Sequence, residues 1–144
     1  MSKTDKSIGT WLSLYSEAIA EVLVNAGYEW VTIDLEHSAI TIDQAEKLIR
    51  VIDLAGAKPY VRVSSNDEVQ IKRVLDAGAK GIIVPMIESK ENVLDAINAT
   101  NYPPKGRRGM GLARAQGYGE AEAKNDYIHN ISNQIELYIP VSYT

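Results

Sequence analysis

The chain has 144 residues, no cysteine and a formal net charge of −4, with 45% hydrophobic and 24% charged residues. This composition is typical of one folded cytoplasmic domain over residues 1–144, and it excludes a disulfide framework, a cysteine zinc site and a thiolate nucleophile. The negative charge argues against nucleic-acid and membrane partners, no apolar run reaches the roughly 18 residues that span a bilayer, and residues 1–7 lack the apolar core of a signal peptide.

The chain opens with an apolar strand and an amphipathic helix. Residues 9–15 predict the strand, and the helix begins at about Ser16 and stops at Gly27. The residues expected to share its apolar face are Ile19, Val22, Leu23 and Ala26.

The second unit repeats this order. Residues 29–37 ("EWVTIDLEH") predict a strand, and Thr41 and Gln44 then form a capping box, in which hydroxyl and amide satisfy each other's free N–H groups. The helix that they open runs to Gly56. Its apolar residues at helical spacing are Ala45, Leu48, Ile49 and Ile52.

Two further units follow. Residues 58–65 predict a third strand, and Ser65 with Glu68 forms a second capping box for the next helix. Residues 80–89 predict a fourth strand, continuously apolar at its centre, as expected when both of its faces are covered. Ser89 caps the helix after it. The inward residues of these two helices are expected to be Ile71, Val74, Leu75, Val93, Ala96 and Ile97.

The pattern changes after Tyr102. Residues 103–119 are rich in glycine, proline and arginine, and loops this long inside a domain are usually functional or disordered. A polar helix over about residues 120–132 and a fifth strand from residue 135 to the C-terminus complete the chain.

Strands that alternate with helices indicate parallel βαβ units and an α/β fold. An open doubly wound sheet and a (β/α)8 TIM barrel both fit. No G-x-G-x-x-G motif follows the first strand, which removes the best support for a dinucleotide-binding sheet and favours the barrel. A complete barrel needs about 250 residues, so we expect this chain to supply about its N-terminal half.

Ionisable residues follow three successive predicted strands. Asp34, Glu36 and His37 end the second strand, Arg62 lies near the end of the third, and Glu88 ends the fourth. Active sites of barrels lie at the C-terminal ends of the strands. We therefore expect these side chains to build a site there.

Asp34, His37 and Arg62 each allow two interpretations. A carboxylate that orients an imidazole makes it a general base near neutral pH; alternatively, Asp34 and Glu36 cap the following segment and His37 is solvated. An arginine inside an apolar strand must be paired or reach a polar cavity. Arg62 therefore either binds a ligand oxygen or forms a salt bridge with the neighbouring acids.

The remaining candidates are less specific. The glycines and basic side chains of residues 102–119 suit a substrate-covering loop, and a nucleic-acid patch is the weaker alternative because no aromatic ladder accompanies them. Asp76 caps its helix, pairs with a lysine or reaches a neighbouring chain. Glu88 is either a metal ligand or the start of the next helix, and His129 is an ordinary surface residue of a polar helix.

Five segments in this order resemble the HpcH/HpaI aldolase family: "GTWLSL", "WVTIDLEHS", "YVRV", "IKRVLDAGAKGIIVPMIES" and "YPPKGRRGMGLARA". The family consists of metal-dependent 2-keto acid aldolases on a (β/α)8 barrel. The resemblance implies cleavage of a 4-hydroxy-2-oxo acid to pyruvate and an aldehyde, with a divalent ion (Mg, Mn or Co) as cofactor.

The resemblance also assigns roles to individual residues. His37 matches the catalytic base, Asp34 the aspartate that pairs with it, and Arg62 the arginine that binds the keto acid and stabilises the enolate. The further candidates are Arg108 and Gly109, which would bind substrate from an active-site loop over residues 103–119, and Asp76, Glu36 and Glu88.

The match is incomplete at the metal site. The family's metal-binding glutamate falls just beyond Thr144 or on Tyr143, and its metal-binding aspartate has no counterpart, so we expect a chain truncated after its fifth strand to lack the metal cage and to have little activity alone. The alternatives are a non-catalytic half-barrel that self-associates, in line with an expected homo-oligomer, and a related lyase that acts on acyl-CoA substrates.

Overall fold

The computed structural model describes residues 6–140 and contains one sheet of five parallel strands. The strands are β1 (Gly9–Leu12), β2 (Trp30–Asp34), β3 (Lys58–Arg62), β4 (Gly81–Ile83) and β5 (Glu136–Tyr138). The α-helices are α1 (Glu17–Asn25), α2 (Ile42–Ala55), α3 (Glu68–Asp76), α4 (Lys90–Thr100) and α5 (Ala121–His129), and the short 3₁₀ helices are η1 (Arg114–Gly119) and η2 (Ile131–Gln134).

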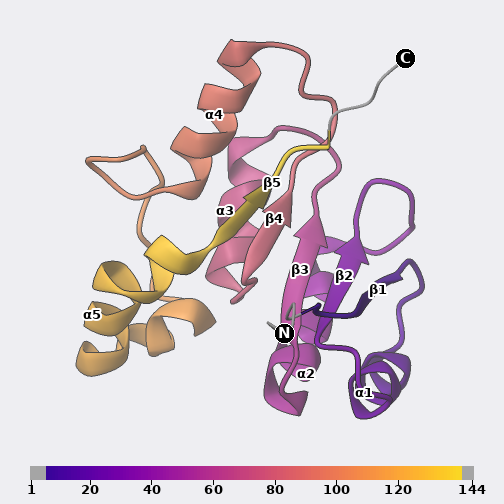
Figure 1. Ribbon diagram of the computed structural model, residues 1–144. Helices are drawn as coiled ribbons and strands as arrows, with labels where there is room; N and C mark the ends of the chain where they lie inside the picture. Colours follow the sequence, from indigo (N-terminus) through magenta and orange to yellow (C-terminus); the bar gives the residue numbers. More distant parts are fainter. Residues whose placement is uncertain (1–5, 141–144) are drawn as a thin grey trace, which may run out of the picture.

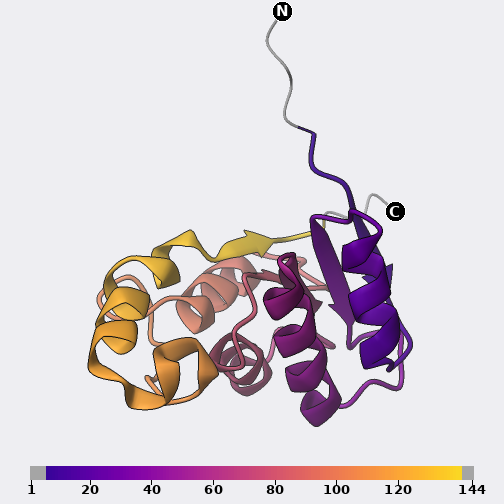
Figure 2. The same cartoon turned by 90° about the horizontal axis from the view of Figure 1, so that it is seen from below.

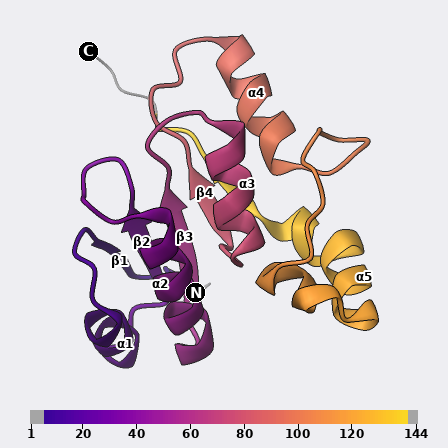
Figure 3. The same ribbon diagram turned by 180° about the vertical axis from the view of Figure 1, so that it is seen from behind.

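The strand order decides between the two candidate architectures. The order is β1-β2-β3-β4-β5, so each strand pairs in parallel with the next one along the chain. Helices α1, α2 and α3 lie on one face of the sheet, and the other face is open (Figures 1 and 3; Figure 2 from below). A doubly wound sheet reverses its order at a switch point and carries helices on both faces. The fold is therefore a segment of a (β/α)8 barrel, as predicted.

Successive residues of each strand point to opposite faces of the sheet. The residues directed at the helices form the core with the apolar faces of α2 and α3, whose predicted inward residues are all buried. The buried strand residues of this core include Leu12, Val31, Ile33, Val61 and Ile82. The intervening residues face the open side, which corresponds to the inside of a barrel.

Two of the predicted helix caps are confirmed and one is wrong. The Thr41 hydroxyl accepts a hydrogen bond from the backbone N–H of Gln44, and Gln44 Oε1 accepts one from the backbone N–H of Thr41. Ser89 caps α4. Ser65 does not cap α3; Asp67 does. An anionic carboxylate interacts with the positive end of the helix dipole more strongly than a hydroxyl, which explains the later start.

The apolar face predicted for α1 is wrong in part. Ala20 is the buried residue of this helix, whereas Ile19 and Val22 are exposed.

Within residues 6–140, no helix combines the length and apolar character that crossing a bilayer requires. Tyr143 and Thr144, on which the expectation of a missing metal ligand falls, lie outside the described residues.

Candidate active site

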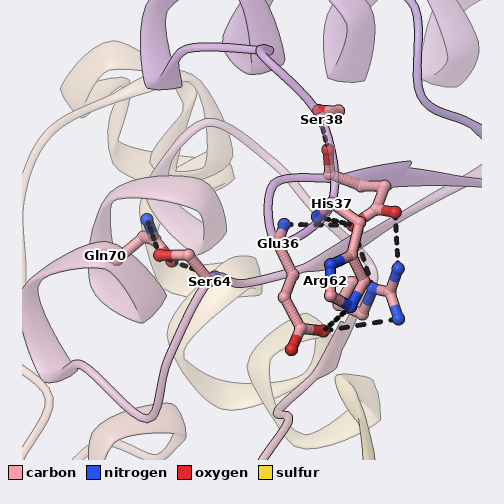
Figure 4. Close-up of polar contacts among 7 residues, drawn as sticks. Glu36, His37, Ser38, Arg62, Ser64 and Gln70 are labelled. Carbon is pink, nitrogen blue, oxygen red and sulfur yellow. Dashed lines mark hydrogen bonds and ion pairs between the residues drawn. The ribbon is translucent and has the colours of Figure 1, made fainter.

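The C-terminal ends of β2 and β3 bring Asp34 and Arg62 together, because the strand register places them side by side. Arg62 Nε donates to Asp34 Oδ1 at 2.9 Å and Nη2 donates to Oδ2 at 2.5 Å, which makes a two-pronged ion pair. Arg62 Nη1 lies 3.3 Å from Glu36 Oε2 (Figure 4). Two carboxylates from the end of β2 thus hold the guanidinium on β3.

Asp34 also ends its own strand. Its Oδ1 accepts the backbone N–H groups of Glu36 and His37 at 3.0 and 3.1 Å, and the Ser38 hydroxyl donates to its carbonyl oxygen. These bonds turn the chain at residue 34, so β2 stops earlier than the sequence predicts. Burial acts to raise the pKa of the Asp34 carboxyl, but the hydrogen bonds from Arg62, His37 and Glu36 outweigh it and the pKa is lowered.

His37 stands beside this cluster with its imidazole largely in solvent, because 69% of its side chain is exposed. Its Nε2 lies 3.6 Å from Glu36 Oε2. The expected pairing of Asp34 with the imidazole is corrected here: Asp34 bonds the backbone of His37 and the side chain of Arg62. The reason is charge, since a guanidinium directly opposite in register binds a carboxylate more strongly than a neutral ring does. The acid that faces the imidazole is Glu36.

Arg62 faces a hollow of about 640 Å³ on the open side of the sheet. This volume lies within the range of sites for small molecules. Trp11, which the sequence-based reasoning missed, lines the hollow, and its ring centroid lies 4.7 Å from Arg62 Cζ. The alternation along residues 9–15 could have identified Trp11 as an inward-facing residue of the first strand.

The loops after β3 and β4 add little to this cluster. The backbone N–H of Ser64 donates to Gln70 Oε1 at 2.7 Å and ties the loop after β3 to α3 (Figure 4). Glu88 is exposed, and its backbone N–H donates to the side chain of Asn92. Glu88 lies one residue before Ser89, the N-cap of α4, so it does not itself begin the helix.

The basic loop lies elsewhere. Arg108 is fully buried, and its Nη2 donates to Asp76 Oδ1 at 2.6 Å and to the Tyr127 hydroxyl at 3.1 Å. Asp76 is the last residue of α3, which runs back from the C-terminal to the N-terminal ends of the strands. This cluster therefore lies near the N-terminal ends of the strands, whereas Arg62 lies at the C-terminal end of β3. Helix α5 is found at the same end of the sheet as the cluster (Figure 1).

Within this chain, that placement keeps residues 103–119 away from Arg62, and the active-site loop stays a prediction. Arg108 binds Asp76 and does not contact Arg62, and Gly109 is exposed beside them. A second basic residue of the segment behaves in the same way, because Arg114 Nη2 donates to Asp53 Oδ2 near the end of α2 at 2.5 Å. The basic side chains thus fasten the segment to α2 and α3.

The residues present do not fit a divalent-metal site. Over residues 6–140, no group of three or more His, Cys, Asp or Glu side chains is placed to hold an ion. Asp34 and Glu36 both form ion pairs with Arg62, so neither of these two carboxylates is free to bind an ion. The cluster nevertheless carries two carboxylates and one guanidinium, and so one excess negative charge.

Comparison with known proteins places this geometry in context. The model of the HpcH/HpaI aldolase/citrate lyase family matches residues 7–138. A hydroxypyruvate/pyruvate aldolase of Paraburkholderia phytofirmans is 39% identical, over 98% of this chain and 56% of its own. A 4-hydroxy-2-oxo-heptane-1,7-dioate aldolase of Klebsiella pneumoniae is also 39% identical, over 93% of this chain and 50% of its own.

Solved structures agree with the sequence relatives. An HpcH/HpaI aldolase from Desulfitobacterium hafniense has a TM-score of 0.87 at 27% identity, covering 96% of this chain and 53% of its own. An HpcH/HpaI aldolase/citrate lyase family protein from Burkholderia cenocepacia has a TM-score of 0.84 at 32% identity, covering 95% and 55%. The chain spans about half the length of the curated relatives it matches.

Proposed function

The chain belongs to the HpcH/HpaI aldolase/citrate lyase family, and we propose that it carries the acid–base part of an aldolase-type carbon–carbon lyase site. The proposed reaction cleaves a 4-hydroxy-2-oxo acid to pyruvate and an aldehyde. The observation that supports it is the Arg62 guanidinium held by Asp34 and Glu36 beside the exposed imidazole of His37.

Each residue has a definite task in this proposal. His37 removes the proton from the 4-hydroxyl group, for which its ring is accessible, and Glu36 at 3.6 Å favours the imidazolium that results. The C3–C4 bond breaks, the aldehyde leaves, and the electron pair becomes a pyruvate enolate, whose C3 then takes up a proton, the equivalent of the one that His37 removed, to give pyruvate. Arg62 holds the enolate oxygen and the substrate carboxylate through the N–H groups that Asp34 and Glu36 leave free.

We propose that the reaction depends on a divalent ion such as Mg²⁺, Mn²⁺ or Co²⁺. The excess negative charge of the cluster opposes the approach of an anionic substrate, and a cation would offset it. Because residues 6–140 do not form a site for the ion, its ligands would lie outside them, and no step of the reaction is assigned to it.

The names of the relatives motivate the substrate class. One relative is an aldolase of hydroxypyruvate and pyruvate, and another is an aldolase of a 4-hydroxy-2-oxo dicarboxylate. The little activity expected of this chain alone, a homo-oligomeric state and a cytoplasmic location stay predictions. The open face of the sheet, with Trp11 and Tyr138 exposed, supports the alternative that the chain is a non-catalytic half-barrel that self-associates.

A coupled pyruvate-release assay on the purified chain tests the proposal, with 4-hydroxy-2-oxo acids and each ion in turn. His37→Ala should lower the rate by about 10²–10⁴-fold, as expected for the loss of a general base. His129→Ala is the matched control, because His129 is exposed on α5 away from Arg62. An unchanged rate in His37→Ala would contradict the proposal, and no turnover by a folded chain with any ion would favour the non-catalytic half-barrel.

A further inference from the structure

Trp11 and Arg62 touch although their strands are not neighbours. Trp11 belongs to β1 and Arg62 to β3, with β2 between them. Adjacent strands lie about 4.8 Å apart, so the two backbones are separated by roughly 10 Å. The indole nevertheless lies over the guanidinium, 4.7 Å from ring centroid to Cζ, and therefore crosses β2.

The sequence of the neighbouring strands makes this crossing possible. The register places Thr32, a small side chain, directly beside Trp11 on β2. The other indole of the face, Trp30, lies across Gly9, where an added Cβ would be only 1.8 Å from its ring, and stacks on Tyr60 at 5.8 Å. Trp30 thus stays toward the start of the strands, and the space above Thr32 is left to Trp11.

The position of the Trp11 ring over β2 leaves a buried hydroxyl without a partner within residues 6–140, which suggests that the ring has a role there. Thr32 is fully buried, and its hydroxyl has no hydrogen-bond partner among the described residues. Trp11 remains 47% exposed, so only part of its surface is buried in this position. The contact that does distinguish this position is the one with the face of the Arg62 guanidinium.

Asp34 accepts hydrogen bonds from two of the N–H groups along the edge of the guanidinium, and Glu36 forms an ion pair with Nη1 at 3.3 Å. Edge contacts fix where the group sits but resist tilting of its plane less than a contact on its flat face does. We infer that Trp11 is a positioning residue for Arg62, which sets the tilt of the guanidinium and so the direction of the N–H groups that face the hollow. As regards catalysis, the inference rests on the proposed function.

The test compares three variants. Trp11→Leu removes the aromatic face, Trp11→Phe keeps one, and Trp30→Phe is the matched control because Trp30 stacks on Tyr60 and not on Arg62. The first measurement is the Nε–H signal of Arg62 in ¹⁵N NMR, identified by its loss in Arg62→Lys. Its hydrogen exchange should be about two- to fivefold faster in Trp11→Leu, as expected from a cation–π contact of about 0.5–1 kcal/mol, and unchanged in the two phenylalanine variants.

The second measurement is the steady-state kinetics of pyruvate release. Trp11→Leu should raise KM about two- to fivefold with little change in kcat, and Trp11→Phe should restore the wild-type KM. An inactive wild-type chain whose Arg62 signal still responds to Trp11→Leu would refute the proposed function and support the positioning role. An Arg62 signal that is the same in Trp11→Leu and the wild type would overturn the inference whatever the activity.

A variant that keeps the indole provides an independent test in case Trp11→Leu does not fold. Thr32→Ile adds bulk beneath the ring and should lift it from Arg62. The Arg62 signal should then change in the same direction as in Trp11→Leu. An unchanged signal in a folded Thr32→Ile protein, with the indole shown to have moved by its cross-peaks, would equally overturn the inference.

Discussion

Replacing Arg62 with methionine should destabilise the fold at neutral pH, because it leaves the Asp34 carboxylate without its ion-pair partner. The Asp34 side chain is only 7% exposed and that of Arg62 22% exposed. Breaking a fully buried pair costs about 3–5 kcal/mol. Asp34 keeps its two backbone hydrogen bonds, from Glu36 and His37, so we expect a smaller loss of about 2–3 kcal/mol in the free energy of unfolding.

The size of this loss should fall at low pH. The lowered pKa of Asp34 means that its carboxylate stabilises the fold above the unfolded pKa of about 3.9, and that this contribution disappears as the pH falls through the folded pKa. Methionine at position 62 no longer holds the pKa down. The stabilities of the wild type and Arg62→Met should therefore converge below about pH 4.

Urea denaturation at a series of pH values measures both effects, and a thermal melt should show a decrease of about 6–12 °C at neutral pH for a chain of this size. Asp34→Asn and the double variant complete a double-mutant cycle, in which we expect a coupling of at least about 1.5 kcal/mol. Additive effects within about 0.5 kcal/mol, or a difference that persists at low pH, would refute the reasoning.

Three further predictions concern other parts of the fold. Thr32→Val should raise the midpoint of thermal unfolding by a few degrees, because a buried hydroxyl without a partner costs about 1–3 kcal/mol; a lower midpoint would show that the hydroxyl is bonded. Asp76→Leu should lower the free energy of unfolding by about 3–5 kcal/mol in urea, because Arg108 would be left buried and uncompensated; a loss below about 1 kcal/mol would contradict this. Thr41→Ala should cost about 1 kcal/mol through the lost cap of α2, and an unchanged urea midpoint would show that the capping box contributes nothing.

Local patterns predicted the elements well, because the residues that decide them lie close together in the sequence. The helical spacing of α2 and the reciprocal bonds of Thr41 and Gln44 are set within one or two turns. The wrong prediction of Ser65 as a cap also has a local cause: Asp67 is closer to the first residue of α3 and carries a charge. The burial of α1 was harder to predict because it depends on what packs over the helix.

The contacts of the basic segment could not be predicted from spacing. The glycine and arginine residues of this segment would suit an anion-binding loop equally well at the N-terminal or the C-terminal ends of the strands. The structure assigns the N-terminal ends through long-range pairs: Arg108 binds Asp76, and Arg114 binds Asp53, each at the end of a helix that returns to the start of the sheet. A carboxylate at a helix end is unremarkable in the sequence, and only the fold shows that a guanidinium is buried against it.

The structure confirms the salt-bridge interpretation of Arg62, and the chemistry of the side chain leaves the proposed ligand binding possible beside it. A guanidinium has five N–H groups. Two of them donate to Asp34, and Nη1 forms only an ion pair with Glu36 at 3.3 Å, so three N–H groups make no hydrogen bond among the described residues. The salt bridge is therefore no alternative to ligand binding. It orients the remaining donors, and the second carboxylate leaves the cluster with one negative charge in excess, so the proposed anionic substrate would bind better where a cation offsets that charge.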